Sequence, residues 1–141
     1  KAINNSNKVA MSLSDLFCVE RHKSQFMDLV KNKLDIVFAN EQEMLSLINA
    51  KSFEEVITFS KEMKKEIVIT RGEMGAVSIY GDKVVECSSQ KNLDIKDLTG
   101  AGDLFAAGYL HGMINKFSYE ERLIKGTELS SKIIQKIGAR I

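Results

Sequence analysis

The chain has 141 residues, which fits one domain of ordinary size, and its 44% hydrophobic and 28% charged residues are typical of a globular protein with a real core. A formal net charge of +1 gives no reason to expect nucleic acid or a membrane as a partner. No apolar run approaches the roughly 20 residues of a membrane-spanning helix. The two cysteines, Cys18 and Cys87, form neither a metal-spaced pair nor a disulfide framework, which favours a reducing, cytoplasmic compartment.

Strand-like and helix-like patterns alternate along the first half of the chain. Short apolar runs predict strands, and apolar residues at helical spacing predict helices. In chain order the pattern predicts a strand at 8–12, a loop or cap at Ser14 and Asp15, a helix at 19–34, a strand at 35–39, a helix capped by Asn40, a helix at 53–63 and a strand at 66–70.

The second half begins with two short strands, 76–80 and 83–87, around the turn residues Gly81 and Asp82, a pattern typical of a hairpin. An apolar helix is predicted at 104–114. Ser118, with Glu121 three residues later, predicts the start of a last helix, which runs to about Ile137 and is ended by Gly138. Strands alternating with helices, followed by one hairpin, predict an α/β layer fold with a mostly parallel sheet.

The segment Asp97–Asp103, DLTGAGD, lies just before an apolar helix. Small residues at three successive positions let the backbone approach a ligand closely, and the unpaired amides of a helix start attract anions. Asp103 is expected at the helix start, where its carboxylate either caps the helix or accepts a proton from a substrate hydroxyl. The simpler interpretation is a tight turn followed by an ordinary helix-terminal carboxylate.

The string DLTGAGDLFAAGYLHG, from Asp97 onward, resembles the second signature of the ribokinase (PfkB) family of small-molecule kinases, whose usual form is D-T-x-G-A-G-D. The resemblance implies that Asp103 is the catalytic base, deprotonating the hydroxyl that attacks the γ-phosphate of ATP. It also implies an anion hole formed by the amides of Gly100, Ala101 and Gly102, which suits phosphoryl transfer. Leu98 replaces the usual Thr; that position is not the base, so activity need not be lost.

Two further segments resemble motifs of this family in order and spacing. Asn40–Glu43 matches N-x-x-E, which implies that Asn40 and Glu43 act near the phosphates and Mg²⁺, Glu43 through water. Thr70–Gly75 matches T-x-G-x-x-G, a nucleotide loop, which implies contacts from Thr70, Gly72 and Gly75. Taken singly, the first also fits a plain N-cap and the second an ordinary loop between strands.

The remaining correspondences concern a cation, the adenine and the acceptor. Asp97 and Thr99 match residues that in many members help bind a monovalent cation such as K⁺. Thr127 falls where many relatives place an Asn beside the nucleotide, although an ordinary position on an amphipathic helix is an equal alternative. The Phe17–His22 stretch and the segment Gly138–Arg140 are similar to adenosine-kinase-like members.

The resemblance implies a ribokinase-like three-layer α/β/α fold, of which 1–141 is the C-terminal ATP-binding and catalytic part, with the N-terminal substrate and lid half absent. The first residue, Lys1, is not Met, which also predicts a fragment. The expected function is transfer of the ATP γ-phosphate to a primary hydroxyl of a nucleoside, adenosine-like first, or of a sugar. The alternative is an inactive nucleotide-binding remnant of a sugar kinase such as ribokinase or fructokinase. A homodimer is one expected assembly, because exposed apolar patches invite association.

Overall fold

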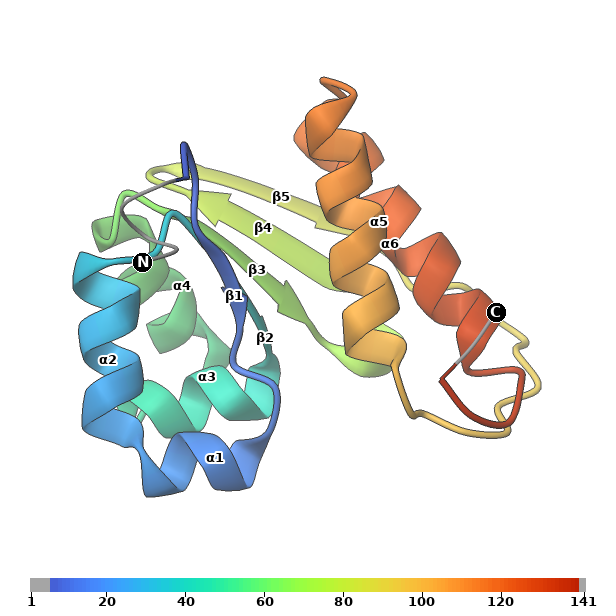
Figure 1. Ribbon diagram of the computed structural model, residues 1–141, viewed down its shortest axis with the longest axis horizontal. Coiled ribbons are helices and arrows are strands. Elements are labelled where there is room, and N and C mark those ends of the chain that lie inside the picture. Colours follow the sequence, from blue (N-terminus) through green and yellow to red (C-terminus); the bar gives the residue numbers. More distant parts are fainter. Residues whose placement is uncertain (1–5, 140–141) are drawn as a thin grey trace. The chain divides into compact units, whose positions relative to one another are not determined.

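The structure is a computed structural model that describes residues 6–139 (Figure 1). The chain divides into two compact units. One contains the residues up to Ile69 together with Ile79–Val84, and the other contains Thr70–Ser78 together with the residues from Val85 onward. Within the described range, no helix is both long enough and apolar enough to cross a membrane.

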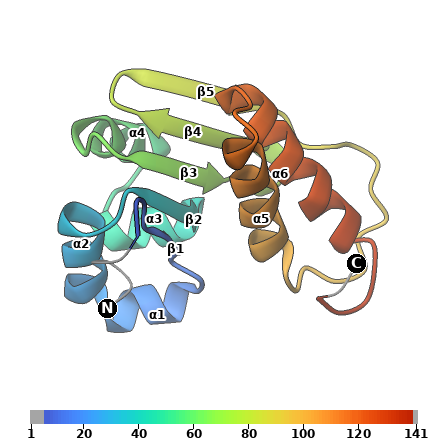
Figure 2. The same ribbon diagram turned by 45° about the horizontal axis from the view of Figure 1, so that its top comes forward.

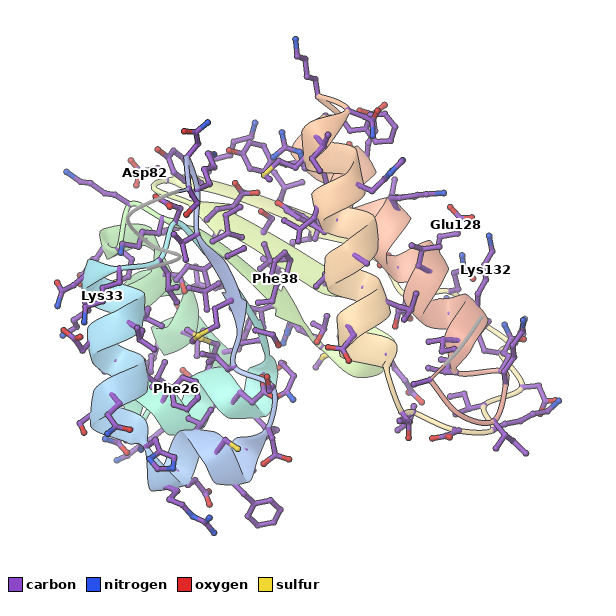
Figure 3. The ribbon with its side chains drawn as sticks, viewed as in Figure 1. Phe26, Lys33, Phe38, Asp82, Glu128 and Lys132 are labelled. Carbon is purple, nitrogen blue, oxygen red and sulfur yellow. The ribbon has the colours of Figure 1, made fainter. Side chains whose placement is uncertain are left out.

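The first unit packs short helices against buried strands around an aliphatic core that includes Val19, Val30, Ile36 and Met44. Its first strand pairs in parallel with the second, with Ala10 opposite Ile36. Phe26 and Phe38, labelled in Figure 3, come from its second helix and second strand. The elements are β1 (Ala10–Ser12), α1 (Leu16–Arg21), α2 (Lys23–Asn32), β2 (Ile36–Asn40), α3 (Glu41–Ile48), α4 (Phe53–Glu62) and β3 (Glu66–Thr70).

The single helix predicted at 19–34 is wrong, because the structure has two helices there. Asp15 starts α1 earlier than expected: its Oδ1 accepts hydrogen bonds from the amides of Phe17 at 2.7 Å and Cys18 at 3.2 Å. His22, with φ −122° and ψ 29°, then leaves the helical region and separates α1 from α2. The expected cap at Asp15 is confirmed.

The second unit contains the short 3₁₀ helix η2 (Gly72–Met74), half of the hairpin β4 (Ala76–Tyr80) and β5 (Lys83–Cys87), and the helices α5 (Ala101–Ile114) and α6 (Tyr119–Ile133). The strands form one sheet in the order β1-β2-β3-β4-β5 (Figure 2). The predicted hairpin is confirmed, with Gly81 at φ 55° in its turn. The α/β fold class predicted from the sequence is confirmed.

Helices α5 and α6 lie side by side (Figures 1 and 2) and approach each other closely at glycines. A Cβ on Gly126 would lie 2.8 Å from the carbonyl oxygen of Phe105, and one on Gly108 would lie 2.6 Å from that of Lys125. The absence of side chains at these positions therefore lets the two backbones meet. On the other side of α6, Glu128 accepts hydrogen bonds from Lys125 and Lys132, and these bonds lower its pKa to about 2 (Figure 3).

Helix α6 begins as predicted, with a capping box between Ser118 and Glu121, but it ends at Ile133 rather than at about Ile137. In a longer helix the carbonyl of Ile134 would accept the amide of Gly138. Here that carbonyl accepts the amides of Lys96 and Asp97, and the amide of Gly138 donates to the Asp97 side chain. A contact distant in the sequence therefore ends the helix, and Gly138 is not its terminator.

Candidate functional site

The glycine turn leads directly into α5. Gly100 is the N-cap in the left-handed region, with φ 80° and ψ 1°. The helix begins at Ala101, three residues earlier than predicted, so Asp103 is the third helical residue and its side chain is exposed. The first helical hydrogen bond runs from the amide of Leu104 to the carbonyl of Gly100 at 2.9 Å. The positive end of the helix dipole therefore lies at this turn.

The three amides expected to form an anion hole differ in their surroundings. The amide of Ala101 donates to the carbonyl of Leu98 at 3.2 Å and closes the turn. A Cβ built on Gly102 meets nothing within 4 Å, whereas one on Gly100 would lie 3.1 Å from the Cβ of Ala139. Gly102 thus borders open space, and the backbone beside it is accessible to a ligand.

A cavity of about 770 Å³ lies within the second unit, and residues of the predicted nucleotide loop and the glycine turn line it together. Thr70 is the last residue of β3, and Gly72 and Gly75 come from the loop that follows it. Ala101 and Gly102 come from the start of α5, and Thr127 comes from α6. The other lining residues are Glu73, Ser89, Gln90, Lys91, Asn92, Leu93, Ile95, Leu98, Phe105, Ser130, Ser131 and Ile134. Six residues that the sequence analysis singled out separately therefore share one cavity.

Gly75 fixes the shape of the predicted nucleotide loop. Its φ of 90° and ψ of −136° suit glycine, and a Cβ there would lie 1.9 Å from the carbonyl oxygen of Cys87. The amide of Arg71 donates to the carbonyl of Gly75 at 2.8 Å, and the Ser89 hydroxyl donates to the carbonyl of Glu73 at 2.6 Å. The loop is therefore held against the chain that follows β5.

Thr127 lines the cavity and contacts a residue that the sequence analysis did not assign to a site. Its Oγ1 lies 3.3 Å from the Sγ of Cys87 at the end of β5. Sequence reasoning also missed the run 89–95 as a cavity wall, because this polar stretch shows neither strand nor helix periodicity. The only signal available was its position between the hairpin and the glycine turn.

Asn40 and Glu43 lie in the first unit, and neither lines the cavity of the second. They form a capping box: the Asn40 Oδ1 accepts the Glu43 amide at 2.8 Å, and the Glu43 Oε2 accepts the Asn40 amide at 2.9 Å. Burial raises the pKa of the Glu43 carboxyl, the hydrogen bond from the Asn40 backbone opposes the shift, and the Asp15 carboxylate adds to it. The plain N-cap geometry is present, and a role beside magnesium stays a prediction.

Asp97 and Thr99 form a compact turn in front of α5. The Asp97 Oδ1 accepts the Thr99 hydroxyl at 2.7 Å and the Thr99 amide at 2.9 Å, while its Oδ2 accepts the Gly138 amide at 2.9 Å. These bonds, first the Thr99 hydroxyl, lower the pKa of the Asp97 carboxyl. Neither residue lines the cavity, nor do Gly100 and Asp103.

Glu43 and Asp97 are the two carboxylates that the sequence resemblance assigns to ions. Within residues 6–139, no group of three or more His, Cys, Asp or Glu side chains could hold a metal ion. Each oxygen of Glu43 accepts one hydrogen bond from Asn40, which leaves acceptor capacity for a water-mediated contact with magnesium. The Asp97 Oδ2 accepts one hydrogen bond and keeps a lone pair that a monovalent cation could share.

The whole chain, residues 1–141, matches the model of the pfkB family of carbohydrate kinases. The chain belongs to this family. A cytidine kinase from Thermococcus kodakarensis is 33% identical to it over 112 residues, which are 77% of this chain and 40% of that enzyme. A PfkB-family chain of this length therefore corresponds to less than half of such a relative.

Solved structures agree with the family assignment. A probable sugar kinase from Rhizobium etli superposes on this PfkB-family chain with a TM-score of 0.92 and 38% identity, covering 97% of the chain and 42% of its own length. An adenosine kinase from Sinorhizobium meliloti gives a TM-score of 0.91 and 37% identity, covering 95% and 41%. Ribokinase from Thermotoga maritima shares the fold at 17% identity, with a TM-score of 0.79. The fold is ribokinase-like.

Proposed function

We propose that the full-length protein transfers the γ-phosphate of ATP to a primary hydroxyl of a nucleoside, or of a sugar. One observation carries the proposal: the T-x-G-x-x-G loop, the glycine turn and Thr127 line the same cavity of about 770 Å³. A cavity of this size is in the range of cofactor pockets. The family membership supports the reaction class, and the shared cavity supports the proposal that this chain binds the nucleotide.

The lining of the cavity contains groups that suit both ends of a nucleotide. Gly102 and the start of α5 would offer backbone amides and the positive end of a helix dipole to a phosphate. Leu93 and Ile95 offer apolar surface, on which a purine would pack, and Thr127 adds a hydroxyl for its polar edge. Binding of ATP by these groups is the proposed role of the cavity.

Asp103 is the proposed catalytic base. Its exposed carboxylate lies in the first turn of α5, beside the amides that would face the phosphoryl group. It takes the proton of the acceptor hydroxyl, the hydroxyl oxygen bonds to the γ-phosphorus, and the bond from that phosphorus to the bridging oxygen of ADP breaks. The amides of the glycine turn, above all that of Gly102, stabilise the charge that develops on the transferred group.

Specific residues of this chain are proposed to hold each ion. Magnesium would supply charge neutralisation to the phosphates when bound, with Asn40 and Glu43 holding its water shell. The capping box orients the Glu43 carboxylate before any ion arrives. Asp97 and Thr99 would help to bind a monovalent cation such as K⁺.

A nucleoside is the first choice of acceptor because the similar proteins include a cytidine kinase and an adenosine kinase, each at 33% identity or more. A sugar is the second choice, since a probable sugar kinase is equally similar. The test is magnesium-dependent ADP release from ATP by the full-length protein with adenosine, cytidine, other nucleosides, ribose and fructose. We expect turnover with one class of acceptor; a folded protein that binds ATP but phosphorylates none would instead support the inactive remnant.

A further inference from the structure

The turn in front of α5 is bound to the segment that follows α6. The carbonyl of Ile134 accepts the amides of Lys96 at 2.8 Å and Asp97 at 3.2 Å. Farther along, the Gly100 backbone packs against Ala139: a Cβ added to Gly100 would lie only 3.1 Å from the Cβ of Ala139. The segment that follows α6, more than thirty positions away in the sequence, therefore contacts the turn at both its beginning and its end.

The Asp97 carboxylate joins these two segments by a side chain. Its Oδ1 orders the turn through the Thr99 amide and hydroxyl, and its Oδ2 accepts the Gly138 amide across the gap of 41 residues. We call these three contacts the Asp97 bridge. Bonds to a charged acceptor are stronger than neutral ones, so the bond from the Gly138 amide adds a charge-assisted contact to the backbone bonds between the turn and the segment 134–139.

The bridge lies next to the proposed catalytic groups without being among them. Asp97 does not line the cavity, but Leu98, Ala101 and Gly102 do, and the Ala101 amide bonds back to the Leu98 carbonyl. A shift of Asp97 would therefore pass through two or three residues of backbone to the amides at the start of α5. Small displacements of such groups cost large factors in rate.

We propose that Asp97 is a positioning residue for phosphoryl transfer, which fixes the glycine turn by joining it to Gly138 in the segment that follows α6. This inference rests on the proposed function. It predicts that the segment 134–139 influences the rate of the chemical step although it contributes only Ile134 to the cavity wall. Nucleotide affinity should change little, because most of the lining comes from the loops at 70–75 and 89–95 and from α6.

The test uses Asp97→Asn in the full-length protein, with Asp94→Asn as the matched control. Asn keeps the shape and can still order the turn at Thr99, but it cannot accept at both ends at once. Asp94 lies three residues earlier, and its side chain is 79% exposed beside Lys96. We expect kcat to fall about tenfold or more in Asp97→Asn, with KM for ATP within about threefold of the wild type and no change in Asp94→Asn.

Amide hydrogen exchange of Gly138 and Thr99 gives a second readout that does not need activity. Asp97→Asn should lower the protection of Gly138, while the backbone bonds to Ile134 keep the variant folded. Gly138→Ala perturbs the residue that donates the same bond. The added Cβ meets nothing within 4 Å, but a φ of 85° is strained for alanine. We therefore expect a loss of kcat that is smaller than in Asp97→Asn.

Equal kcat values for Asp97→Asn and Asp94→Asn would overturn the inference, as would unchanged exchange of Gly138. If Asp97→Asn does not fold, normal kcat in Gly138→Ala would overturn it, and a selective loss of kcat would support it. A wild type that phosphorylates no acceptor would contradict the proposed function, and the exchange of Gly138 would then decide the bridge alone.

Discussion

Gly75 and Gly102 lack a side chain for different structural reasons. Gly75 makes room for protein: a side chain there would strike the backbone of Cys87. Gly102 borders open space, because an added Cβ would meet no atom from elsewhere in the chain within 4 Å, and the residue lines the cavity. The sequence shows both as turn glycines, and only the surroundings separate a folding requirement from a binding one.

Gly102→Val is therefore expected to weaken ADP binding while leaving the protein folded. The valine side chain would enter the cavity rather than the core, so we expect about a tenfold or larger loss of affinity, in line with the cost of misfitting a ligand. The matched control is Ala107→Val, which places the same valine side chain at an exposed position of the same helix. Calorimetric titration with ADP measures both, and unchanged affinity in Gly102→Val would argue against a phosphate cradle at this turn.

At the scale of elements, the pair α5 and α6 depends on the glycines at its crossing. Gly108 and Gly126 are buried, and an added Cβ would contact backbone atoms that cannot rotate away. Gly112 differs, because its nearest neighbours are the side-chain atoms Arg122 Cγ and Phe117 Cδ2 at 3.1 Å. The glycine turn belongs to α5, so the packing of this pair also holds the proposed site.

Gly126→Ala should destabilise the protein although alanine favours a helix. Overpacking costs about 1–3 kcal/mol, against a gain of about 0.8–1.0 kcal/mol in helix propensity. Gly112→Ala is the control, with a smaller cost because flexible side chains can yield. Urea unfolding at constant m-value compares the two. A Gly126→Ala protein as stable as the control would mean that the close approach of the helices is not a constraint.

Local signals in the sequence predicted most elements, and the errors have two sources: the local backbone of His22, which divides the helix predicted at 19–34, and a long-range contact at the end of α6. The caps at Asp15, Asn40 and Ser118 were predictable because each lies within three residues of its partner. The end of α6 was not, since it depends on Asp97. The T-x-G-x-x-G loop and the glycine turn were found by motif. The residues at 89–95 that line the cavity have no periodic pattern, and only the fold shows their position.

At the scale of the whole molecule, the chain spans about 40% of the length of the relatives it matches. The described residues contain a cavity of about 770 Å³, in which we propose that the nucleotide binds, and an exposed aspartate at a helix start, both in the second unit. Asn40 and Glu43 lie in the first unit. A measurement of the complete reaction is therefore needed to test whether the proposed residues of both units contribute to it.

The most direct measurement is acceptor-stimulated release of ADP by the full-length Asp103→Asn protein. Loss of a general base predicts a fall in kcat of about 100-fold or more, with ADP affinity within about threefold of the wild type. Asp82→Asn, in the exposed turn between β4 and β5 (Figure 3), is the control and should keep full activity. Wild-type turnover by Asp103→Asn would contradict the assignment of Asp103 as the catalytic base.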